Sequence, residues 1–234
     1  TGAYYVPDVD IESKAVYTNN IPCGAMRGFG VNQVTFAMES CIEQLCVLGG
    51  FDPWQLRYDN VLDTGKETAT GQILGKGVGL KKTLLAVKDE FYAAQIAGLA
   101  CGIKNCGIGN GVTEDCEVKI EIKSEDPIIL QHGWTEMGQG VDTVAQQILC
   151  EELAIEDPGI IEVKVSTESR ARAGMTTASR ATFQMGHAII DAAKLLQKDL
   201  KTNHLSELSG KVYTGRWVCD WTTRLGEPGD VRTH

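Results

Sequence analysis

Three glycine-rich stretches, each placed just before a run of helical periodicity, most constrain what this chain can fold into. They occupy residues 24–30 (GAMRGFG), 133–140 (GWTEMGQG) and 174–186 (GMTTASRATFQMG). A loop of this kind that enters a helix exposes unpaired N–H groups and the positive end of the helix dipole. The pattern therefore predicts three potential anion-binding loops, each of which also carries polar side chains.

The remaining periodicity predicts an α/β protein in which mixed sheets are backed by helices. Apolar residues at three- and four-residue steps predict helices over residues 31–48, 80–96, 141–153 and 183–200. A short helix over residues 53–60 is predicted to start with Asp52 as N-cap, Pro53 at the first position and Gln55 returning the capping bond. Strands are predicted over residues 117–122, 127–132, 161–165 and 212–217. The change from helices to strands places a domain boundary near Gly98, which divides the chain into residues 1–98 and 99–234.

Charge and composition argue against several classes of partner. A net charge of -9 gives no basic patch for nucleic acid, and no apolar run reaches the length of a membrane span. The eight cysteines lack the two-residue spacing of zinc and redox sites, so we expect no metal ligand among them. A cytoplasmic protein is the resulting expectation.

Each loop has a functional and an ordinary interpretation when it is considered alone. The fork of Arg27 suits a phosphate and the ring of Phe29 can stack on a flat heterocycle, but a tight turn with a buried ring is the alternative. Gln139 lies between two glycines, where its amide can bind a ligand or belong to a capping turn. The third loop offers hydroxyls and N–H groups, or an ordinary N-cap. None has the pattern of a dinucleotide fold or a P-loop, and the four histidines lie near no nucleophile elbow.

Taken together, the loops resemble one known family. Residues 22–33 (PCGAMRGFGVNQ), 133–140 and 177–180 (TASR) are similar, in order and approximate spacing, to the large molybdenum-binding region of xanthine dehydrogenases and aldehyde oxidoreductases. The similarity extends from Ala3 to about Leu200. It implies parts of two molybdopterin-binding domains, with residues 1–98 ending the first and residues 99–234 beginning the second.

The resemblance also implies roles for individual residues. Cofactor-binding positions are Arg27, Gly138, Gln139, Ser179, Arg180 and Ala181, and the last three match the segment that cradles the pterin phosphate or dinucleotide. Substrate-binding positions are Ala25, Phe29, Thr177 and Ala178, among which Phe29 stacks on the substrate. No metal ligand is implied. The three loops would then form three sides of one pocket.

The family hydroxylates a heterocycle or an aldehyde with oxygen from water, using a glutamate of a Gly-Glu-Pro motif as general base. Glu227 lies in such a motif, but it follows Arg180 by only 47 positions, too few for the family's intervening domain, and its neighbours suggest a charged turn. We therefore assign no catalytic residue. Asn32 and Trp134 also depart from the family, which usually has proline and often has glycine there.

The implied cofactor is molybdopterin, as a mononucleotide or a cytosine dinucleotide, with iron–sulfur clusters and FAD on other segments or subunits. The expected substrate is a purine-like heterocycle, and we expect a homo-oligomer and an isolated chain that is inactive. The alternatives are an aldehyde or aromatic thioester oxidoreductase of the same family, or a non-catalytic interaction module that keeps the fold.

Overall fold

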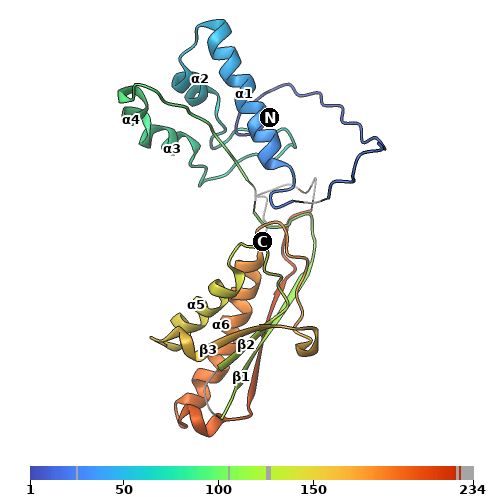
Figure 1. Cartoon of the computed structure of the whole chain (residues 1–234), viewed down its shortest axis with the longest axis vertical. Coiled ribbons are helices and arrows are strands. Elements are labelled where there is room, and N and C mark those ends of the chain that lie inside the picture. Colours follow the sequence, from blue (N-terminus) through green and yellow to red (C-terminus); the bar gives the residue numbers. More distant parts are fainter. Residues whose placement is uncertain (25, 105, 125–127, 225–226, 228–234) are drawn as a thin grey trace. The chain divides into compact units, whose positions relative to one another are not determined.

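The computed structural model describes residues 1–24, 26–104, 106–124, 128–224 and 227 (Figure 1). Contacts divide the chain into two compact units, Thr1–Lys104 and Asn105–His234, and each unit is described here by itself. The domain boundary expected near Gly98 stays a prediction. Within the described part of the chain, no helix is long and apolar enough to cross a membrane.

The first unit is built from helices. They are α1 (Val31–Gly49), α2 (Pro53–Asn60), α3 (Leu80–Ala86) and α4 (Lys88–Ala93). The first two confirm the predicted helices. Asp52 caps α2 as expected, because its carboxylate accepts from the Gln55 amide at 2.7 Å. The returning bond was predicted wrongly, since the Gln55 side chain donates to Asp59 Oδ1 at 2.8 Å instead.

The single helix predicted over residues 80–96 is wrong, because the chain breaks it at Val87 and ends it at Ala93. The buried indole of Trp54 donates from Nε1 to the Leu84 carbonyl at 2.9 Å. In a continuous helix that carbonyl would accept from the amide of Lys88. The helix is therefore interrupted at the point where the buried Trp54 side chain donates to the Leu84 carbonyl.

A buried ion pair joins the helices of the first unit to its N-terminal segment. Arg57 of α2 is 1% exposed and donates from Nε to Glu39 Oε2 of α1 at 2.9 Å. The Tyr4 hydroxyl donates to the other carboxylate oxygen of Glu39. Burial, together with this hydrogen bond, raises the pKa of Tyr4 far above its ordinary value. Glu43 also accepts from Arg57, at 3.3 Å, but its side chain is half-exposed.

The second unit contains a four-stranded mixed sheet. Its strands are β1 (Glu114–Ile122), β2 (Ile128–His132), β3 (Ile161–Val165) and β4 (Val212–Cys219), in the order β3-β2-β1-β4. β1 pairs antiparallel with both β2 and β4, and β2 pairs parallel with β3. The four predicted strands are confirmed, although β1 begins three residues earlier than residue 117 and β4 ends two residues later than residue 217.

Two helices cover one face of this sheet. They are α5 (Val141–Leu153) and α6 (Ala181–Leu200), and they lie along the strands in Figure 1. Short 3₁₀ turns occupy Pro158–Ile160, Thr167–Ser169 and Leu205–Leu208. Alternate residues of β1, from Cys116 to Ile122, are buried under the helices. The mixed α/β class predicted from the periodicity is therefore confirmed.

Gly215 of β4 allows α6 to approach the sheet closely. A Cβ at this position would lie 2.0 Å from the Ala188 carbonyl and 2.4 Å from the Ala192 amide. Only a residue without a side chain allows backbone to pack against backbone this tightly. The position of α6 on the sheet therefore depends on this glycine, which the sequence analysis did not single out.

The buried Arg57–Glu39 pair allows a stability test with a matched control. We expect Glu39→Gln to destabilise the first unit by about 3 kcal/mol, because it leaves a buried guanidinium without its main counter-charge. Glu43→Gln, the same chemical change at the half-exposed partner, is expected to cost below about 1 kcal/mol. Urea unfolding followed by the fluorescence of Trp54, the tryptophan of this unit, measures both. Equal losses in the two variants would contradict the assignment.

Candidate functional site

The loop at residues 24–30 belongs to the first unit and leads into α1. Phe29 adopts a left-handed backbone (φ 50°) and its side chain is 65% exposed, so the alternative of a ring buried in the core is wrong. Gly30, also left-handed, precedes the helix and gives it no side-chain cap. Arg27 is exposed as well, and Ala25 lies outside the described residues.

The other two loops meet in the second unit. The Thr135 amide donates to Thr176 Oγ1 at 2.8 Å, which joins the loop before α5 to the loop before α6. Gly133 makes the approach possible, because a Cβ there would lie 2.6 Å from the Ala171 carbonyl. Two of the three loops that were predicted to line one pocket are thus in direct contact. That the loop at residues 24–30 joins them stays a prediction.

Arg180 is the side chain that shapes the loop before α6. It is 2% exposed, and its guanidinium forms a two-pronged ion pair with the Glu114 carboxylate at the start of β1. Its Nη1 also donates to the carbonyls of Met175 and Thr177, each at 2.7 Å. The guanidinium is therefore engaged with the protein, and its carbon lies 5.3 Å from the centre of the Trp134 ring.

The residues just before α6 have an unusual backbone and unsatisfied polar groups. Ala178 and Ser179 are both left-handed, with φ of 57° and 52°, a conformation that is unfavourable for residues other than glycine. The N-cap of α6 makes no side-chain capping bond. Thr177 Oγ1 and both amide atoms of Gln184 are buried without a well-formed hydrogen bond among the described residues. This helix start thus offers open donors beside the Thr177 hydroxyl, which has no hydrogen-bond partner among the described residues.

The loop before α5 is different, because it satisfies its own donors. Glu136 Oε1 accepts from the amides of Gly138 at 2.7 Å and Gly140 at 3.0 Å, and Oε2 accepts from Asp142 at 3.4 Å. These amides, that of Gly140 first, lower the pKa of Glu136 below its ordinary value. Gln139 is held in the same loop: its Oε1 accepts from Met137 at 2.6 Å and its Nε2 donates to the Thr135 carbonyl at 2.8 Å.

His132, at the end of β2, anchors this loop to the sheet. The fully buried ring accepts the Trp134 amide at Nδ1 (3.2 Å), and its Nε2 lies 3.1 Å from Asp142 Oδ1, although not in an ideal hydrogen-bonding direction. Burial lowers the pKa of His132 and so favours a neutral imidazole, whereas the nearby Asp142 acts in the opposite direction and raises the pKa. Trp134 itself is buried, with Nε1 3.3 Å from Cys116 Sγ, so this departure from the family adds to the core.

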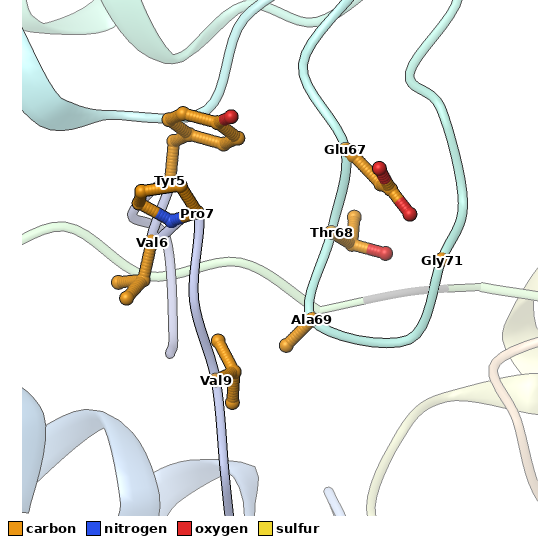
Figure 2. A pocket seen from close by; sticks show the side chains of 8 residues that line it. All are labelled: Tyr5, Val6, Pro7, Val9, Glu67, Thr68, Ala69 and Gly71. Carbon is orange, nitrogen blue, oxygen red and sulfur yellow. The ribbon is translucent and has the colours of Figure 1, made fainter.

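Other candidate positions lie apart from these loops. The Glu227 carboxylate accepts from the Arg224 amide at 3.1 Å, and its flanking Gly226 and Pro228 fall outside the described residues. All eight cysteines are described and free, and the described residues contain no group of three metal-binding side chains. A small cleft in the first unit, of about 180 Å³, lies between residues 5–9 and 67–71 (Figure 2). It contains none of the predicted site residues.

Sequence reasoning missed three residues that organise the site. Glu114 precedes the predicted strand and lies 66 positions from Arg180, so no local pattern links the two. His132 ends a predicted strand, and nothing in the sequence links it to Trp134 or Asp142. Glu136 had a usable signal, because it is an acidic residue in the glycine-rich loop that leads into a predicted helix, and a carboxylate is favoured near a helix N-terminus.

Comparisons with known proteins agree with this arrangement. Two family models, both described as a molybdopterin cofactor-binding domain, match residues 1–61 and 86–216. The chain is 32% identical over 222 residues to a probable xanthine dehydrogenase subunit from Bacillus subtilis, covering 89% of this chain and 29% of that protein. It is 40% identical over 97 residues to the nicotinate dehydrogenase large molybdopterin subunit of Eubacterium barkeri, covering 42% and 22%.

Among solved structures, the aldehyde oxidoreductase of Desulfovibrio gigas matches with a TM-score of 0.65 and 25% identity, covering 85% of this chain and 24% of that one. The chain therefore belongs to the molybdopterin cofactor-binding domain family of xanthine dehydrogenases and aldehyde oxidoreductases, as the loops predicted. It spans less than a third of the length of each of these relatives.

The buried guanidinium allows a second matched test. We expect Arg180→Lys to destabilise the second unit by about 3 kcal/mol, because an ammonium cannot bind both Glu114 oxygens and two carbonyls at once. Arg172→Lys is the control, since Arg172 is 55% exposed and pairs with Asp115 and Glu117, and it is expected to cost below about 1 kcal/mol. Denaturant unfolding monitored by circular dichroism measures both, and a similar small loss at Arg180 would refute its structural role.

Proposed function

We propose that this chain forms part of the molybdopterin site of a molybdenum hydroxylase that hydroxylates a purine-like heterocycle with oxygen from water. The observation that carries the proposal is the junction of the loops before α5 and α6. There an uncapped helix start, a strained backbone and the buried Thr177 hydroxyl lie together, and Gln139 is linked to them through its bond to Thr135, whose amide donates to Thr176. Strained backbone and unpaired buried polar groups are concentrated at binding sites.

The geometry fits an anionic cofactor group at the start of α6. Open amides at a helix N-terminus attract phosphate, and α6 has 20 residues to sustain the dipole. Thr177 Oγ1 provides a further donor for a phosphate oxygen. Arg180 has its guanidinium bonded within the protein, so we assign its contribution to holding the segment of Ser179 and Ala181 in shape rather than to direct charge contact.

Each remaining predicted residue has a limited part in this proposal. When bound, the molybdenum cofactor supplies the redox chemistry. Gln139 keeps one Nε2 hydrogen and one Oε1 lone pair beyond its two bonds within the loop, which suffice to orient a polar ligand edge. Gly138 (φ 90°) keeps side-chain atoms away from that edge. Arg27, Ala25 and Ala178 remain proposed pocket residues.

The substrate class is argued from Phe29 and from the relatives. An exposed aromatic face binds a flat ring by stacking. Two relatives carry the names of xanthine and nicotinate enzymes, whose substrates are flat nitrogen heterocycles, whereas one of the solved structures that match is an aldehyde oxidoreductase. The second candidate is therefore an aldehyde oxidoreductase.

Both sequence relatives are named as subunits, which supports partner subunits as carriers of iron–sulfur clusters and FAD. The form of the pterin and a homo-oligomeric state also remain proposals.

Phosphate binding at α6 is testable without the whole enzyme. In a ¹⁵N NMR titration of the 234-residue chain with inorganic pyrophosphate, we expect shifts concentrated at the amides of residues 178–183, weakening as salt is added. Thr177→Val removes the hydroxyl and should weaken binding about fivefold, the loss of one hydrogen bond of about 1 kcal/mol. Thr202→Val, just beyond the C-terminal end of α6, is the control. Unshifted amides at residues 178–183 would rule out this site.

The choice between heterocycle and aldehyde is tested at Phe29. In the complete enzyme, we expect Phe29→Ala to lower kcat/KM for a purine about fivefold, through loss of a stacking contact of about 1 kcal/mol. Turnover of a small aliphatic aldehyde, which has no flat ring to stack, should change less. The neighbouring Met26→Ala variant controls for general disturbance of the loop. Equal losses on both substrates would favour the second candidate.

A further inference from the structure

We propose that Glu136 is a built-in anion that closes the start of α5 and thereby positions Gln139, an inference that rests on the proposed molybdopterin site. Without its carboxylate, two neighbouring helices would present similar glycine-rich N-termini to one anionic ligand. With it, only the start of α6 remains open. Glu136 then acts as a positioning and specificity-determining residue rather than as a ligand of the cofactor.

The hydrogen bonds of Glu136 all lie at the start of α5. Its two oxygens accept from three backbone amides, those of Gly138, Gly140 and Asp142, at 2.7, 3.0 and 3.4 Å. These amides surround the first turn of α5, where an external phosphate would otherwise bind. The carboxylate therefore occupies the position of such an anion while it remains attached to the chain.

Gln139 lies between Gly138 and Gly140, whose amides donate to Glu136. Both polar atoms of its side chain are bonded to loop backbone, at Met137 and at the Thr135 carbonyl. The direction of the Gln139 amide is consequently set by the loop conformation. That conformation requires left-handed backbone at Gly138 (φ 90°) and Gly140 (φ 79°), whose amides the carboxylate holds in place.

The surroundings of Glu136 do not suit it to catalysis or to charge pairing. An ionised carboxylate with three donors and a lowered pKa is a weak base, so Glu136 is poorly suited to remove a proton from a substrate. No lysine or arginine is bonded to it among the described contacts, and its partners all belong to its own loop and helix. What the contacts support is control of the loop and of the helix end.

The start of α6 differs from the start of α5 in its polar groups. The start of α6 has neither a capping side chain nor an acidic residue in its first turn. Thr177 Oγ1 lies buried beside it without a partner among the described residues. The start of α5 carries the Glu136 carboxylate and also Asp142 in its first turn, whereas the first turn of α6 carries no acidic residue, although both loops are rich in glycine and meet through Thr135 and Thr176.

The test is a gain of anion binding in the full 234-residue chain. In Glu136→Ala, we expect inorganic pyrophosphate to shift the amides of residues 138 and 140–142, which stay unshifted in the unmodified protein. The chemical shifts of the Gln139 side-chain NH₂ group should also move to the values of a solvent-exposed amide. A role limited to stability would lower the unfolding midpoint without creating a new anion response. Glu151→Ala, an exposed change on the last turn of the same helix, is the control.

Glu136→Gln keeps the shape and removes the charge, so it carries the test if the alanine variant does not fold. We then expect a weaker but measurable new response at residues 138 and 140–142. The proposal is overturned if neither variant gains this response, or if the unmodified protein already responds there. Absence of the response at residues 178–183 in every variant would instead refute the phosphate site of the proposed function, so the two failures are distinguishable.

Discussion

The second unit depends on one buried ion pair. Arg180 and Glu114 join the residue before α6 to the first residue of β1, and the same guanidinium holds two carbonyls of the intervening loop. A buried charge of either sign alone would be strongly unfavourable. The beginning of β1, the strained backbone at Ala178 and the start of α6 are therefore linked by a single interaction. The proposed anion site at the start of α6 is thus held in shape by a cation that a bound anion need not touch.

The three glycine-rich loops look alike in sequence but differ physically. The one before α1 exposes an aromatic ring, the one before α5 satisfies its donors with Glu136, and the one before α6 keeps open donors around a rigid core contact. Glycine content describes what the backbone can do, whereas the neighbouring acidic or basic side chain decides what it does. The difference between these loops is thus a matter of one residue each.

Much of the fold was predictable because it follows local periodicity. The ranges of α5 and β3 agree with the sequence prediction to the residue, since their apolar spacing is regular and their flanks carry clear breakers. The break at Val87 was not predictable, because the Leu84 carbonyl just before it accepts from the Trp54 indole, which lies 30 positions away from Leu84 in the sequence. The site residues were named from family resemblance and stay predictions, whereas the Arg180–Glu114 pair and the closeness of α6 to Gly215 are long-range contacts with no local signal.

The close contact at Gly215 has a thermodynamic consequence. Because α6 rests on the sheet through backbone atoms near Ala188 and Ala192, with no side chain between them, it has little freedom to slide or rotate. The orientation of its N-terminal amides is settled when the protein folds. A ligand that binds there therefore loses little free energy to ordering the receptor, and preorganisation of this kind raises affinity without adding a contact.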